Sequence, residues 1–128
     1  MMQALLQQEL GNGFLVESAG VSETAKLGQH ANDHSVLCML EREIDITGHV
    51  SQWVGDLRLT QYSHIVCVGE NEAIQVAHFL SLSEYTTVIV ANGENGGVPN
   101  PYEKGLPAYR ECLDLLDQVI PSIALMIR

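Results

Sequence analysis

The sequence is poor in basic residues and in aromatic ones. Six lysines and arginines stand against sixteen aspartates and glutamates, which gives a formal charge of −10, and aromatic residues make up only 5% of the chain. Nucleic acids and anionic membrane surfaces would be repelled at long range by a protein of this charge. We therefore expect neither nucleic acid nor a membrane to be a partner.

Long hydrophobic runs are also missing. The longest apolar stretches, such as residues 65–68 and 87–90, are far shorter than the roughly 20 residues that a membrane-spanning helix needs. The first ten residues lack the basic start and the small-residue cleavage site of a secretory signal. We expect a cytoplasmic protein.

Cysteine is scarce and odd in number, because the chain has only Cys38, Cys67 and Cys112. All three are widely spaced and lie in apolar patterns. This arrangement suits reduced, buried thiols better than a disulfide framework, and it agrees with a cytoplasmic location.

What is present fits one globular domain over residues 1–128. Strand patterns alternate with helix patterns, which is typical of an α/β sandwich of three layers around a parallel sheet. We expect strands over residues 14–19, 64–69 and 85–91, and helices over residues 1–10, 30–42, 51–60, 71–80 and 102–120. Gly11 should stop the first helix, Pro121 should end the last, and the second should bury Val36, Leu37, Leu40 and Ile44.

Several motifs, in the same order along the chain, resemble the low-molecular-weight protein tyrosine phosphatases, to which one group of arsenate reductases is related. The matching stretches are Met1-Met2-Gln3-Ala4-Leu5-Leu6, Glu17-Ser18-Ala19-Gly20, residues 34–49, residues 62–68, and Val98-Pro99-Asn100-Pro101-Tyr102 followed by Tyr109. Glu43 stands where the family usually has Gly. The resemblance implies the phosphotyrosine phosphatase I-like fold.

The resemblance also implies where catalytic groups would lie. The family uses a thiolate and an arginine in a Cys-x5-Arg loop, and this loop precedes the helix that residues 1–6 match. The sequence as given holds no such loop, because none of its cysteines has an arginine at that spacing. Asn100 occupies the position of the family's general acid, and an amide has no titratable proton to donate.

Further positions take their expected roles from the same resemblance. Ser18 and His49 match residues that support the catalytic loop through hydrogen bonds. Trp53 and Tyr102 are candidate aromatic residues at the mouth of the site, although a single tryptophan is more often a packing anchor. Without the first, central strand, the sheet would need to close up, exchange a strand with a second copy, or accept one from a partner.

Three functions remain open on the sequence. The first is a phosphatase-like protein without activity or cofactor that binds a protein partner or forms a homodimer. The second is an active tyrosine phosphatase whose given sequence starts too late, at an internal Met. The third is a metal-binding module that uses His30, His34 and Cys38, which would form one stripe if a single helix carried them.

Overall fold

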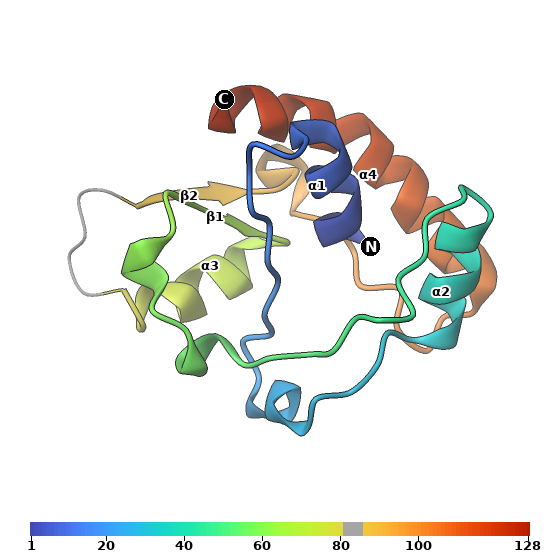
Figure 1. Cartoon of the computed structure of the whole chain (residues 1–128), viewed down its shortest axis with the longest axis horizontal. Helices are drawn as coiled ribbons and strands as arrows, with labels where there is room; N and C mark the ends of the chain where they lie inside the picture. The colour runs from blue at the N-terminus through green and yellow to red at the C-terminus, as the bar shows by residue number, and fades with distance from the viewer. Residues whose placement is uncertain (81–85) are drawn as a thin grey trace.

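The computed structural model describes residues 1–80 and 86–128. The helices are α1 (Met2–Leu10), α2 (Asp33–Leu40), α3 (Glu70–Ala77) and α4 (Leu106–Ile127), and the strands are β1 (His64–Cys67) and β2 (Thr87–Val90). Short 3-10 helices cover Glu23–Leu27, Val54–Asp56, Leu59–Gln61 and Gly93–Asn95. Figure 1 shows α1 packed beside α4, with α2 near the other end of α4 and α3 next to the strands.

The two strands pair in parallel, with His64 opposite Thr87 and Cys67 opposite Val90. This confirms the predicted parallel arrangement, and α3 makes the crossover that parallel strands require. The predicted strand over residues 85–91 is shorter, and its first residue, Tyr85, lies outside the described residues. The result is an α/β fold with a small parallel sheet.

The prediction of a strand over residues 14–19 is wrong. This segment is extended, but it pairs with no strand in the described part of the chain. Glutamine side chains of α1 bind its backbone instead. The Val16 N–H donates to Gln7 Oε1 at 2.9 Å, and the Val16 carbonyl accepts from Gln3 Nε2 at 3.1 Å.

Several helix boundaries also differ from the sequence prediction, among them the start of α2 and both ends of α4. α2 begins at Asp33, because the Asn32 side chain caps it by accepting from the His34 N–H at 2.9 Å. α4 continues through Pro121 to Ile127, since Ile123 and Ala124 beyond the proline are buried. In place of the predicted helix over residues 51–60, the structure has two 3-10 turns.

α2 ends in a Schellman motif. The Ile44 N–H donates to the Met39 carbonyl and the Glu43 N–H to the Leu40 carbonyl, both at 2.9 Å. Glu43 is in the left-handed region with φ 60°. A left-handed conformation favours glycine, the residue that the resembled family usually has at this position.

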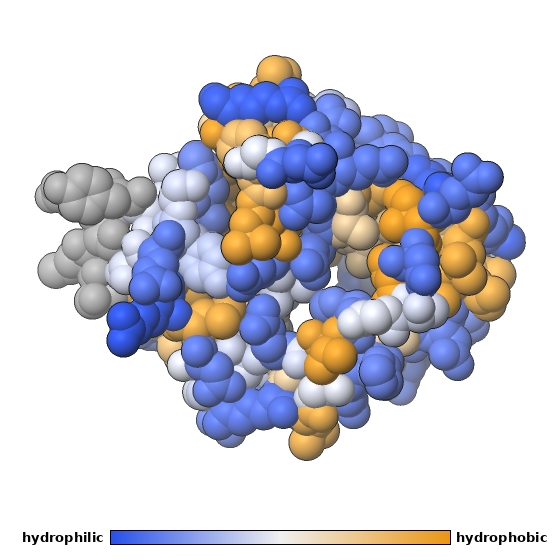
Figure 2. Space-filling model, viewed as in Figure 1, coloured by the Kyte–Doolittle hydropathy of each residue, from blue (hydrophilic) through white to orange (hydrophobic). Residues whose placement is uncertain are grey.

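The core consists of two clusters, one on each side of the small sheet. The larger lies among α1, α2 and α4 and includes Met39 and Leu116, and the smaller lies by α3 and includes Cys67 and Val76. The prediction that Leu37 and Leu40 face the core is wrong, since they are 51% and 48% exposed. The opposite face of α2, with Cys38 and Met39, packs on α4 instead, and Figure 2 shows apolar side chains over α2.

Candidate functional site

Asn100 lies at the rim of a cleft at the carboxyl end of β1. The cleft has a volume of about 350 Å³ and is lined by Val68, Gly69, Glu70, Asn71, Glu72, Gly96, Val98 and Asn100. Asn100 Oδ1 accepts a hydrogen bond from the Tyr102 N–H at 3.0 Å. The amide therefore serves as the turn residue before Pro101, a role in which asparagine is common.

The charge of this cleft is negative. Glu70 and Glu72 lie in the first turn of α3, where the partial positive charge of a helix N-terminus favours carboxylates. The lining includes no lysine or arginine. The described lining thus carries two carboxylates and no cationic side chain.

The three thiols are buried and free, which confirms the sequence prediction. Cys38, Cys67 and Cys112 are 1%, 4% and 8% exposed. Burial raises the pKa of each thiol, and nearby negative charge from Glu41 adds to the rise at Cys38. Because the thiolate is the nucleophilic form, none of them has the environment of a reactive cysteine.

Ser18 and His49 lie around the beginning of α1. Ser18 Oγ donates to Gln3 Oε1 at 2.5 Å. The His49 ring is half-buried, and desolvation together with the positive charge of the Met1 amine lowers the pKa of this histidine. Ser18 thus contacts α1 and His49 lies near the chain's first residue, while the role of either residue in supporting a catalytic loop stays a prediction.

Trp53 anchors loops in the smaller core cluster. Its Nε1 donates to the Val21 carbonyl at 3.4 Å, Lys26 Nζ lies 4.0 Å from its ring centroid, and Phe79 packs edge-on against it. These contacts fit a packing role. Tyr102 is 59% exposed, and a role for either aromatic residue in substrate recognition stays a prediction.

The proposed metal stripe does not form. His30 precedes α2 and pairs with Val50 in an isolated bridge, and the His34 ring packs against Tyr109. Within residues 1–80 and 86–128, no group of three or more potential ligand side chains could hold a metal ion. The prediction assumed that one helix carried all three residues, and the cap at Asn32 separates His30 from that helix.

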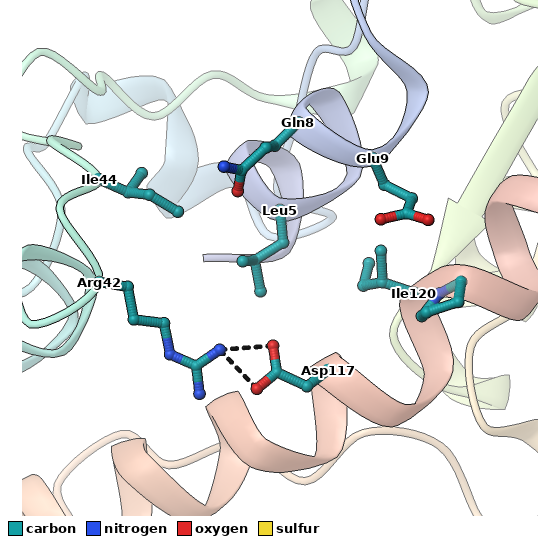
Figure 3. A pocket seen from close by; sticks show the side chains of 8 residues that line it. Leu5, Gln8, Glu9, Arg42, Ile44, Asp117 and Ile120 are labelled. Atoms are coloured by element: carbon teal, nitrogen blue, oxygen red, sulfur yellow. Dashed lines mark hydrogen bonds and ion pairs between the residues drawn. The ribbon is translucent and has the colours of Figure 1, made fainter.

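A second pocket of about 200 Å³ lies between α1 and α4, and sequence reasoning missed it (Figure 3). Arg42 Nη1 donates to the Asp117 carboxylate at 2.5 Å, over a floor that includes Leu5, Ile44 and Ile120. This bond raises the pKa of Arg42. The Arg42 guanidinium is already paired with the Asp117 carboxylate. We therefore interpret this ion pair as a contact that joins the end of α2 to α4. No local pattern predicts this ion pair, since Arg42 and Asp117 are far apart along the chain.

Comparison with known proteins identifies a family whose sequence profile matches nearly the whole chain. The sequence profile described as "Low molecular weight phosphotyrosine protein phosphatase" matches residues 1–127. No curated protein matches the chain. In the described part of the structure, no helix is both long and apolar enough to cross a membrane.

Solved structures have the same fold at low identity. Wzb from Vibrio vulnificus, in complex with benzylphosphonate, is 22% identical with a TM-score of 0.84, and the match covers 98% of this chain and 87% of that one. The tyrosine phosphatase Wzb from Escherichia coli K30, in complex with sulphate, is 19% identical with a TM-score of 0.82 and coverages of 99% and 87%. The YwlE arginine phosphatase from Geobacillus stearothermophilus is 21% identical with a TM-score of 0.80 and coverages of 98% and 82%.

Proposed function

The chain belongs to the low-molecular-weight phosphotyrosine protein phosphatase family over residues 1–127, and we propose that this domain has no phosphatase activity and acts by binding a protein. The bound protein is either another polypeptide or a second copy of the chain. The main support for the proposal is the hydrogen bonding of Asn100. Its amide is engaged in a turn and cannot donate a proton to a leaving group.

The cysteines give further support. A phosphatase of this kind needs a thiolate next to a cradle of N–H groups and an arginine. Each thiol described here is buried, with a raised pKa. The cleft that Asn100 lines contains Glu70 and Glu72 in place of cationic side chains. Within residues 1–80 and 86–128, the structure therefore supports neither a reactive thiol nor a cationic phosphate site, and Asn100 cannot act as the general acid.

The direct test is a phosphatase assay of purified residues 1–128 with p-nitrophenyl phosphate. We expect no turnover above the buffer rate, and we expect the Asn100→Asp variant to be equally inactive, because a general acid alone cannot replace a nucleophile. Turnover that vanadate inhibits would overturn the proposal.

Ligand binding gives a second, independent measurement. Benzylphosphonate and sulphate are the ligands named with the two Wzb structures. Titration of either into isotopically labelled protein should leave the amide resonances of Val68, Glu70 and Asn100 unchanged. A saturable shift of these resonances would favour a working anion site.

The alternative of an active phosphatase makes a different prediction. It requires an in-frame Cys-x5-Arg motif encoded upstream of Met1, and a longer product that hydrolyses aryl phosphates. Self-association is tested separately by sedimentation of residues 1–128 over a range of concentrations, where a homodimer would raise the average mass.

A further inference from the structure

Asparagine is followed by glycine at three places in the chain, which are Asn12-Gly13, Asn92-Gly93 and Asn95-Gly96. An asparagine in such a pair can lose its side-chain amide, because the next backbone nitrogen can attack Cγ and glycine has no Cβ to hinder the approach. Asparagine is counted among the thermolabile residues. Since the three pairs share this local sequence, the fold decides which of them reacts.

The first pair lies in the turn directly after α1, where Figure 1 shows the chain reversing its direction. The Phe14 N–H donates to the Gly11 carbonyl at 3.4 Å, so Asn12 and Gly13 are the two central residues of this turn. Both are exposed, and a Cβ built on Gly13 would meet no atom within 4 Å. Among the described residues, neither the Asn12 side chain nor the Gly13 N–H has a hydrogen-bond partner. The attacking nitrogen and the amide that it attacks are therefore both accessible.

The second pair is held by its own loop. Asn92 Nδ2 donates to the Gly97 carbonyl at 3.1 Å, and Asn92 Oδ1 accepts from Asn95 Nδ2 at 3.2 Å. The backbone of Asn92 is in the left-handed region, with φ 54° and ψ 34°. Its carbonyl accepts from the N–H groups of Asn95 and Gly97, at 3.0 and 2.9 Å. These bonds fix both the side chain and the backbone, and they keep Asn92 Cγ from turning towards the Gly93 nitrogen.

The third pair is protected at its nitrogen. The Gly96 N–H donates to the Gly93 carbonyl at 3.3 Å, while Asn95 Nδ2 is bonded to Asn92 Oδ1. Attack at Asn95 would require both of these hydrogen bonds to break. The fold thus protects two of the pairs and leaves the pair at Asn12 open.

On these grounds we propose that Asn12 is a site of spontaneous deamidation in the folded protein, whereas Asn92 and Asn95 stay intact. The Gly13 nitrogen gives up its proton to base and bonds to Asn12 Cγ, the Cγ–Nδ2 bond breaks, and Nδ2 leaves as ammonia with the proton. Water then opens the resulting cyclic imide at either carbonyl. Opening at Cγ gives aspartate, and opening at the main-chain carbonyl carbon gives isoaspartate. The reaction consumes water and releases ammonia, and nothing is oxidised or reduced.

Either product adds a carboxylate beside the end of α1, to a chain whose formal charge is already −10. The partial negative charge of a helix C-terminus disfavours a carboxylate there, and α1 has no basic residue in its last turn to offset it. The added charge also gives a direct readout, because anion exchange separates the modified chain from the original one. This modification site goes beyond the proposed function and does not depend on it.

Incubation of folded residues 1–128 at mildly alkaline pH, in water enriched in heavy oxygen, tests the assignment. Newly formed carboxylates carry the heavy oxygen, and mass spectrometry of proteolytic peptides locates them. We expect Asn12 to convert at least about tenfold faster than Asn92 or Asn95 in the folded protein, because a hydrogen-bonded site reacts only when it opens. In urea, where the loop at Asn92 is unfolded, the three asparagines should convert at similar rates.

Three variants separate the causes. Asn12→Gln keeps an amide at this position and should abolish the early acidic form, since the longer side chain closes a ring less readily. Gly13→Ala places a Cβ in open space and should slow conversion at Asn12 several-fold by hindering the nitrogen. Asn95→Ala removes the bond to Asn92 Oδ1 and should speed conversion at Asn92 several-fold, without a change at Asn12.

The proposal fails if Asn12 stays intact in the folded protein over a time in which all three asparagines convert in urea. It also fails if Asn92 or Asn95 converts as fast as Asn12 in the folded protein. A preference for Asn12 of the same size in urea would make local sequence the cause and would equally overturn the role of the fold.

Discussion

The Gln7 side chain binds the backbone of Val16 as a neighbouring strand would. Its Oε1 accepts from the Val16 N–H at 2.9 Å, and its Nε2 donates to the Phe14 carbonyl at 2.7 Å. An amide side chain carries the same donor and acceptor as a peptide unit. These two bonds hold an extended segment on α1, although no strand of the described residues pairs with it.

Replacing Gln7 by alanine should therefore destabilise the fold. The change removes the partners of the Val16 N–H and the Phe14 carbonyl, which water can reach, and we expect a loss of about 0.5–1.5 kcal/mol in the free energy of unfolding, measured by urea denaturation. The control is Gln8→Ala, at an exposed position of the same helix with no hydrogen bond in the structure. Equal stability of the two variants would contradict the role of Gln7.

Glu43→Gly should stabilise the protein. Glu43 has φ 60°, a conformation that costs a side chain roughly 1–2 kcal/mol, while glycine loses about 0.4–1 kcal/mol through the greater freedom of the unfolded chain. A net gain of about 0.5–1 kcal/mol follows from these two figures. The matched control is Glu111→Gly inside α4, which should be destabilising by about 1 kcal/mol.

Pro121→Ala should also raise stability. The proline lies inside α4 and has no N–H to donate to the carbonyl four residues earlier, at Asp117. We expect a gain of about 1–3 kcal/mol in thermal or urea unfolding. Pro107→Ala is the control, since Pro107 lies in the first turn, where an N–H has no partner within the helix. If both variants gain equally, the proline's position in the helix is not the cause.

Thiol labelling checks the state of the cysteines. Cys38, Cys67 and Cys112 are buried and burial raises the pKa of each, so an aromatic disulfide reagent at neutral pH should label the native protein at least about a hundredfold more slowly than the urea-unfolded one. Rapid labelling of one cysteine in native protein would identify a reactive thiol and count against an inactive domain.

The stability of the fold should fall at mildly acidic pH through His49. Burial and the Met1 amine lower the pKa of this histidine in the folded state, so the unfolded chain binds a proton more readily. Above pH 6.5, the pKa of about 6.5 that His49 has in the unfolded chain, this loss of stability is absent. The loss grows as the pH falls towards the lower pKa that His49 has in the folded protein. His49→Gln should flatten the stability profile in this range, as measured by urea denaturation at a series of pH values.

Much of the fold follows from local signals. The β-branched runs at 64–69 and 85–91 predicted the parallel pair β1 and β2, and Gly11 was correctly expected to stop α1, where it has φ 82°. The burial of the three cysteines was equally readable, because each lies in an apolar pattern. Family membership was readable from the order of short motifs, and the profile match over residues 1–127 confirms it.

Other features depend on partners distant in sequence. α2 buries Cys38 and Met39 in place of Leu37 and Leu40, because α4 packs on that face. The sequence of α2 alone does not predict the position of α4. α4 passes through Pro121 because Ile123 and Ala124 bury their side chains beyond it, and this burial offsets the cost of the proline.

The sequence alone determined the family, the parallel pairing of the β-branched segments that form β1 and β2, and the amide at Asn100, because each depends on the residue types present and their spacing. Tertiary structure decided that residues 14–19 form no strand and which face of α2 is buried. A strand forms only where a second backbone supplies its hydrogen bonds. Here the side chains of Gln3 and Gln7 bind the backbone groups of Val16 instead. Which backbone meets which is a matter of three-dimensional packing, and no pattern within the segment specifies it.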